Sequence, residues 1–200
     1  EQVVSFYQQG KFDQAIELAQ QALELCEQAK GVDAPDAATM LHNLASLQMA
    51  KGDLIAAVKS YTRSLEIREK VMGPDHLLTA QSLNGLANVL RVQGQAATAA
   101  PLFERALRIR EAELGPDHID VATVLRNLGL LHQAEGRNDV AKPYFERTLV
   151  IREKTLGVTH LEVANSLLDL AASEKALGDL DAMRSLLERA LTIREKNIGP

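Results

Sequence analysis

Apolar residues recur three and four positions apart in stretches of about two dozen residues or fewer. Between residues 77 and 92, for example, Leu83, Leu86 and Leu90 keep this spacing. Such spacing gathers apolar side chains on one face of an α-helix. The pattern therefore predicts amphipathic helices over residues 77–92 and, by the same spacing, over residues 97–114.

Glycines divide the chain into units of one length, because two series of glycines advance in steps of 42 residues. One series is Gly10, Gly52, Gly94, Gly136 and Gly178, and the other is Gly31, Gly73, Gly115, Gly157 and Gly199. A glycine of the first series ends the first helix of each period, in the place where a left-handed residue closes a helix. Gly115-Pro116 ends the second, because proline cannot continue a helix. We name the first helix of each period A and the second B.

One helix pair cannot bury both of its faces, so neighbouring pairs must stack into a continuous core. We therefore expect an all-α fold, a right-handed α-α superhelix of about five helix-turn-helix repeats. The array should fill residues 1–200 as a single domain that is a fragment of a longer protein. Its expected repeats are approximately 1–31, which is partial, then 32–73, 74–115, 116–157 and 158–200.

The residues that recur at fixed positions of each period resemble those of tetratricopeptide repeats. A helices carry the large-plus-small pair of that family at Leu86-Ala87 and Leu170-Ala171, and B helices carry its small and aromatic positions, as at Ala99 and Phe103. The 42-residue length is similar to the kinesin-light-chain type of repeat, whose typical letters Leu149 through His160 follow closely. The resemblance implies a protein-interaction scaffold in which A helices line a concave groove that holds an extended peptide, while B helices form the convex side.

The resemblance also implies where a partner binds, namely at exposed A-helix positions. Asparagine suits such a groove because its amide both donates to and accepts from a peptide backbone. Arg91 and Arg126 make the middle of the groove basic, so we expect an extended, partly acidic peptide across repeats 2 to 4. The expected peptide-binding residues are His42, Asn43, Ser46, Asn84, Asn88, Arg91, Arg126, Asn127, Leu130, Gln133, Asn165 and Asp169.

One A-helix slot differs in every repeat, which suggests that its side chain faces solvent or a partner. The family usually has a tyrosine late in helix A. This chain has Gln48, Leu90, His132 and Glu174 there.

Composition narrows the class of partner. The net charge of −5 and the lack of a basic run predict no nucleic-acid binding. The sequence contains no apolar stretch of 18 residues, so no membrane span is predicted. Cys26 is the only cysteine, which fits a reducing compartment, and we expect a cytoplasmic protein.

Histidines that recur in the turns invite a metal-site interpretation, but their spacing argues against it. His76, His118 and His160 should lie about one helix-packing distance apart, roughly 10 Å, whereas a zinc ligand lies about 2.1 Å from its ion. We therefore expect them to be turn and helix-start residues, with Asp117 a further capping group. No metal or cofactor is predicted.

Other periodic residues are equally well explained by the scaffold. The Glu104-Arg105 step and its equivalents should form ion pairs along or between repeats. Pro101 and Pro143 should produce a local bend or a late helix start. Since no local motif gathers an acid, a base and a nucleophile, we expect no enzyme.

Two other functions compete with the peptide-binding scaffold. The array could be the regulatory or sensor arm of a larger multidomain signalling protein. It could also self-associate through repeats that lack polar capping helices at either end of the sequence.

Overall fold

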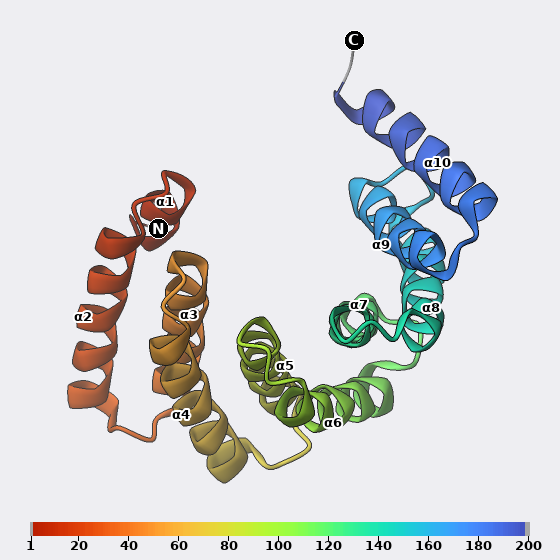
Figure 1. Cartoon of the computed structure of the whole chain (residues 1–200). Helices are drawn as coiled ribbons and strands as arrows, with labels where there is room; N and C mark the ends of the chain where they lie inside the picture. The colour runs from red at the N-terminus through yellow and green to blue at the C-terminus, as the bar shows by residue number, and fades with distance from the viewer. Residues whose placement is uncertain (1, 199–200) are drawn as a thin grey trace. The chain divides into compact units, whose positions relative to one another are not determined.

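The computed structural model describes residues 2–198, and every regular element in this range is an α-helix (Figure 1). The helices are α1 (Gln2–Gln8), α2 (Phe12–Lys30), α3 (Pro35–Lys51), α4 (Leu54–Met72), α5 (Leu77–Val92), α6 (Ala96–Leu114), α7 (Ile119–Ala134), α8 (Asn138–Leu156), α9 (Leu161–Leu177) and α10 (Leu180–Ile198). Odd-numbered helices are the A helices and even-numbered ones the B helices. The expected all-α arrangement of helix pairs is confirmed.

The prolines of the B helices lie inside them. Pro101 is the sixth residue of α6, and Pro143 is the sixth residue of α8. The expectation of a late helix start is therefore wrong, because both helices begin five residues earlier. A proline this near the amino end removes a single bond to the carbonyl four residues back, which the rest of a 19-residue helix tolerates. The expected local bend stays a prediction.

The two glycine series have different backbone conformations, which explains why both are needed. Gly52, which ends α3, is left-handed, with φ 90° and ψ 5°. Gly73, which ends α4, has φ 99° and ψ 160°, a region that is essentially restricted to glycine. Its N–H donates to the carbonyl of Glu69 at 3.2 Å, so the chain leaves the helix without an orphaned donor.

The chain forms two compact units, Glu1–Ile109 and Arg110–Pro200, and the boundary falls within α6. In unit 1, α2 packs on α3, α3 on α4, α4 on α5, and the A helices α3 and α5 also meet. The buried cluster at its amino-terminal end is built from Leu23, Leu41, Leu44, Leu47 and Ile67, together with small alanines.

Unit 2 repeats the same order of packing. Here α7 packs on α8, α8 on α9, α9 on α10, and the A helices α7 and α9 meet. Phe145, Leu149, Val163, Leu167 and Ile193 lie in its buried cluster. Each unit therefore places two neighbouring A helices in direct contact.

In three of the Ile-Arg-Glu runs a buried arginine joins a B helix to the next A helix. Arg68 donates to the carbonyl of Leu78 at 2.8 Å, and Arg152 donates to the carbonyl of Glu162 at 3.2 Å, ten residues on in both cases. Arg110 makes the equivalent bond to Asp120. Burial lowers the pKa of Arg68 to about 10, which still leaves its guanidinium protonated at neutral pH. Cys26 lies in the equivalent slot of α2 and is also buried.

Ion pairs between successive B helices accompany these arginines, as the sequence predicts. Arg105 pairs with Glu69 at 2.5 Å, and Arg147 pairs with Glu111 at 2.6 Å, so each pair joins residues 36 apart. These side chains remain about one-third exposed, so each pair contributes little stability. Because these pairs recur at one separation, they help to hold successive B helices in register. Their recurrence indicates a scaffold role for the paired residues.

Candidate functional site

Most of the predicted partner-binding residues lie half-exposed on A helices, and each unit carries its own set. We call His42, Asn43, Ser46, Asn84, Asn88 and Arg91 on α3 and α5 the unit 1 A-surface. We call Arg126, Asn127, Leu130, Gln133, Asn165 and Asp169 on α7 and α9 the unit 2 A-surface.

The unit 1 A-surface is joined by contacts between neighbouring A helices. The Asn88 amide nitrogen lies 3.7 Å from the Met49 sulfur, across the α3–α5 contact. Arg91, one turn further along α5, donates from Nε and Nη2 to the Asn88 amide oxygen at 3.2 and 2.8 Å. A neutral amide thus orients the guanidinium and leaves its positive charge uncompensated by that contact.

A buried tyrosine from a B helix supports the middle of the unit 1 A-surface. The Tyr61 hydroxyl lies 2.8 Å from the Ser46 hydroxyl, and its ring meets the His42 ring edge-on with centroids 5.1 Å apart. Burial raises the pKa of Tyr61, so the hydroxyl is neutral at physiological pH. Gly85 permits this position, because a Cβ there would overlap the Tyr61 ring.

The amino-terminal edge of the unit 1 A-surface has an apolar hollow. Val3, Val4 and Tyr7 of α1 line it on one side, and Asn43 and Ser46 of α3 line it on the other, beside Leu47. Val4 and Tyr7 are 57% and 47% exposed, so this hollow has both apolar and polar walls open to solvent.

The unit 2 A-surface has a different centre, because two of its predicted residues pair with each other. Arg126 of α7 donates from Nε to Asp169 Oδ2 at 2.5 Å and from Nη2 to Asp169 Oδ1 at 3.2 Å. The hydrogen bond to Asp169 raises the pKa of Arg126. The expected basic character of this stretch is therefore neutralised by a carboxylate on the neighbouring A helix.

Other residues of the unit 2 A-surface also make contacts within the unit. Gln133 donates to the Ser173 hydroxyl at 3.5 Å, again between α7 and α9. Asn165 donates to Glu162 at 3.3 Å and accepts from Arg194 of α10 at 3.1 Å. These bonds preorganise polar side chains that are still partly exposed.

The variable A-helix slot is buried in three of its four repeats, so the expectation that it faces solvent or a partner is wrong there. Gln48 is 6% exposed and accepts from the Ser60 hydroxyl at 2.8 Å. His132 stacks on Tyr144 with centroids 5.5 Å apart. Glu174 is 5% exposed and pairs with Lys142 at 2.8 Å.

Three of the four slot residues have a partner on a B helix, and that partner differs from one repeat to the next. In two repeats the partner lies 12 residues later, Ser60 for Gln48 and Tyr144 for His132. A search of the sequence for matched changes at that separation could have found these two pairs.

The turn histidines are helix caps. In each of His76, His118 and His160, Nδ1 accepts the backbone N–H two residues later at 3.1 Å. This confirms their prediction as helix-start residues. The expected capping by Asp117 is wrong, because its carboxylate pairs with Lys154 at 2.5 Å. Within residues 2–198, no three His, Cys, Asp or Glu side chains gather as a metal site would require.

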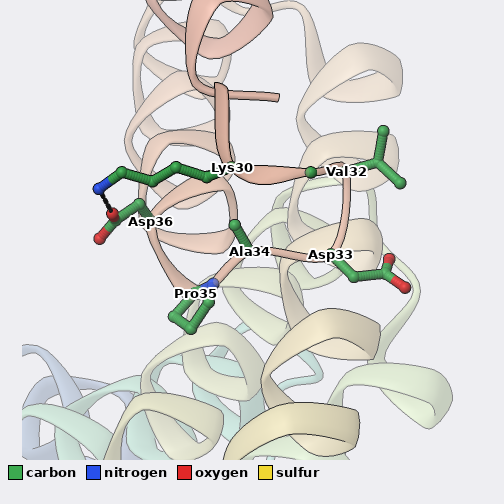
Figure 2. Close-up of a pocket in the computed structure, with 7 residues that line it drawn as sticks. Lys30, Val32, Asp33, Ala34, Pro35 and Asp36 are labelled. Atoms are coloured by element: carbon green, nitrogen blue, oxygen red, sulfur yellow. Dashed lines mark hydrogen bonds and ion pairs between the residues drawn. The ribbon is translucent and has the colours of Figure 1, made fainter. Parts of the chain in front are cut away.

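A shallow hollow lies at the turn between α2 and α3. Figure 2 shows Lys30 and Asp36 paired on one side of the turn, with Val32 and Asp33 pointing away on the other. Because the walls belong to one short turn, the hollow gathers no convergent polar groups. None of the described helices has the length and apolar character needed to cross a membrane.

Helix pairs that stack in the same register from one repeat to the next, with small residues where they meet, are typical of helical repeat proteins. The tetratricopeptide repeat model matches residues 3–48, 36–112, 80–154 and 120–196. The chain belongs to the tetratricopeptide repeat family. This fold is typically a non-catalytic scaffold for protein–protein interaction.

Solved structures support the kinesin-light-chain type of repeat. BtubC (BKLC) from P. vanneervenii is 24% identical, with TM-score 0.85, over 99% of this chain and 79% of that one. Putative kinesin light chain repeats from Podosopora anserina are 25% identical, with TM-score 0.80, over 98% and 93%. A Rap protein complexed with Competence and Sporulation Factor is 17% identical, with TM-score 0.81, over 96% and 52%. No curated protein sequence matches the chain.

Proposed function

We propose that the chain binds extended segments of a partner protein on its A-surfaces. The observation that carries this proposal is the continuity of half-exposed polar side chains across neighbouring A helices within each unit. In unit 1 that continuity runs from Met49 to Asn88 and Arg91. In unit 2 it runs from Arg126 of α7 to Asp169 of α9.

Amide side chains suit an extended partner for a simple chemical reason. Helical backbone groups bond within the helix, so the A-surfaces can reach a partner only through side chains. An extended segment presents backbone N–H and C=O groups along its length, and an amide can satisfy either. Asn43, Asn84, Asn88 and Gln133 therefore supply affinity for a backbone without specifying its sequence.

Charge distinguishes what the unit 1 A-surface selects. Arg91 is the only charged residue of α5, and its oriented contact is with the neutral amide of Asn88. A guanidinium has five donors in a planar fork that matches a carboxylate. We therefore expect an acidic side chain of the partner to bind at Arg91.

A neighbour with the same fold adds support. The solved Rap protein is complexed with Competence and Sporulation Factor. By analogy of fold, an array of this type can hold a partner, while the residues used here follow from this chain alone.

The test compares two arginine variants that change the same charge. After capture and purification of a partner, its Kd is measured by calorimetry against the wild type, Arg91→Gln and Arg108→Gln. Arg108 is an exposed B-helix residue on α6 and is the matched control. We expect Arg91→Gln to weaken binding about tenfold, as loss of one charge-assisted contact would, and Arg108→Gln to leave Kd unchanged. Equal Kd values for all three proteins would contradict the proposal.

Self-association and a role as a regulatory arm of a larger protein are the alternative functions, and a cytoplasmic location stays a prediction. Sedimentation velocity at several concentrations tests self-association directly. A sedimentation coefficient that rises with concentration would favour it over a monomeric receptor.

A further inference from the structure

We propose that Asp169 is a specificity-determining residue, which occupies the guanidinium of Arg126 and makes the unit 2 A-surface select against acidic side chains of a partner. This inference rests on the proposed function, because it concerns which partner segments that surface accepts.

The geometry of the pair leaves a partner carboxylate at a disadvantage. Two nitrogens of the Arg126 fork, Nε and Nη2, already donate to the two oxygens of Asp169, at 2.5 and 3.2 Å. This is the bidentate arrangement that a partner carboxylate would seek. Because Asp169 is attached to the neighbouring helix, its carboxylate competes at a high effective concentration.

The pair is also more protected than the ion pairs at the turns. The Asp169 side chain is 15% exposed and that of Arg126 is 34% exposed, whereas Lys154 and Asp117 are 64% and 59% exposed. Salt and solvent screen a partly buried pair less than an exposed one. The Arg126–Asp169 contact therefore persists at physiological ionic strength while the A-surface is still accessible.

Nearby charges reinforce the same preference. Arg152 pairs with Glu162 at 3.0 Å, so this second cation of the region also has a carboxylate of its own. Glu162 further contributes a favourable field at Arg126. A partner acid near Arg126 would thus meet Asp169 and Glu162, and an uncharged polar side chain fits the surface better.

Only one repeat contains this pair. The slot of Arg126 holds His42, Asn84 and Leu168 in the other repeats, and the slot of Asp169 holds Glu1, Asn43, Gly85 and Asn127. An arginine followed 43 residues later by a carboxylate therefore occurs in these slots at one place on the array, as a specificity pair should, and is not a requirement of the repeat fold.

The closing experiment reads Arg126 itself, with a small probe. The Nε–Hε NMR signal of Arg126 is followed while N-acetylglutamate α-amide is added, and N-acetylglutamine α-amide serves as the uncharged control. The proteins are the full chain as wild type, Asp169→Asn, and Asp169→Asn with Arg126→Gln. Asparagine keeps the shape of Asp169, and circular dichroism checks that each variant folds.

We expect no saturable shift in the wild type and a saturable shift with the acid in Asp169→Asn. In the double variant the Arg126 signal is lost, and the signal of Arg152, the second arginine of this region, should not move. An equal shift in the wild type and Asp169→Asn would overturn the inference, and so would no shift in Asp169→Asn.

A second arm uses a partner segment that binds the wild type, in two versions that differ by Glu or Gln at the residue placed beside Arg126. The ratio of their Kd values should be near one or favour Gln in the wild type. It should move on the order of tenfold toward Glu in Asp169→Asn, and return in the double variant. A ratio that stays the same in all three proteins overturns the inference. If no segment of a purified partner binds the wild type, the proposed function fails, while the NMR titration still decides the role of Asp169.

Discussion

The two A-surfaces occupy the same places in their repeats and differ in how their arginines are held. On unit 1, Arg91 is oriented by the neutral amide of Asn88. On unit 2, Arg126 is held by the carboxylate of Asp169. The difference teaches that a basic residue in a repeat slot need not indicate an acidic partner, because a neighbouring helix can already supply the acid, as Asp169 does for Arg126.

Beneath these surfaces the two units use the same scaffold. Buried Arg68 and Arg152 each bond to the next A helix. One B-helix ring in each unit packs beside a glycine, Tyr61 beside Gly85 of the next A helix and Phe145 beside Gly129 of the A helix before it. Substitutions in the scaffold should therefore act alike in the two units, while substitutions on the A-surfaces should not. The four predictions that follow test this contrast.

The largest effect is expected from the buried arginines. Arg68→Met keeps an apolar stem and removes the donors to Leu78, Gln81 and Ser82, at 2.8, 3.1 and 2.8 Å. We expect a loss of about 3 kcal/mol in the free energy of unfolding, because buried acceptors are left without donors. Arg152→Met should cost a similar amount. Urea denaturation followed by circular dichroism measures both, and a loss below about 1 kcal/mol in either variant would break the symmetry of the scaffold.

The next effect is expected where a glycine lies against a ring. In Gly129→Ala the new Cβ would lie 2.5 Å from the Phe145 ring, and Gly85→Ala would crowd Tyr61 in the same way. Crowding of a packed core typically costs about 1–3 kcal/mol, partly offset by the better helix propensity of alanine. Thermal or urea unfolding checks this, with Thr123→Ala, an exposed change on α7, as the control. If either glycine variant were as stable as the wild type, the close packing described here would be contradicted.

The architecture could be predicted from the sequence because it depends on local signals. The glycine series marked the helix ends, and α5 begins and ends where the spacing of Leu83, Leu86 and Leu90 indicates. The turn histidines were also predictable, since a cap acts on the backbone two residues away. Signals of this range need no knowledge of how helices pack.

The contacts of the A-surfaces were harder to predict because they join different helices. Arg126 and Asp169 are 43 residues apart, one period plus one residue, and only the placement of α7 against α9 makes them partners. The burial of Gln48 and Glu174 was missed for the same reason, since each has a polar partner on a B helix. A polar residue that varies between repeats is easily taken for an exposed one, because the sequence does not show which residue of another helix it contacts.

A smaller effect should separate the two arginines of the A-surfaces. Arg126→Gln removes an ion pair that joins α7 to α9, and we expect it to lower the free energy of unfolding by about 0.5–1 kcal/mol. Arg91→Gln removes a hydrogen bond to a residue one turn away on α5, and its effect should stay within about 0.5 kcal/mol. Urea denaturation of both variants sharpens the comparison. An equal loss in the two would show that Arg91 is as structural as Arg126.

The smallest effect is expected at the turns. Lys70 pairs with Asp33 in unit 1, and Lys154 pairs with Asp117 in unit 2, all four side chains being more than half exposed. Such pairs contribute almost nothing, so Lys70→Ala and Lys154→Ala should leave the urea midpoint unchanged. A clear shift of the urea midpoint in only one of the two variants would contradict this and show that the turns of the two units differ.

The most direct test of the central claim, that a partner lies on the A-surfaces, is site-specific photo-crosslinking. A photoreactive phenylalanine analogue replaces Asn43 in unit 1 or Gln133 in unit 2, and Glu104 on the B helix α6 serves as the control. With a purified partner, we predict a crosslinked product from at least one A-surface position and none from the control. A product from the Glu104 position, with none from Asn43 or Gln133, would contradict the account.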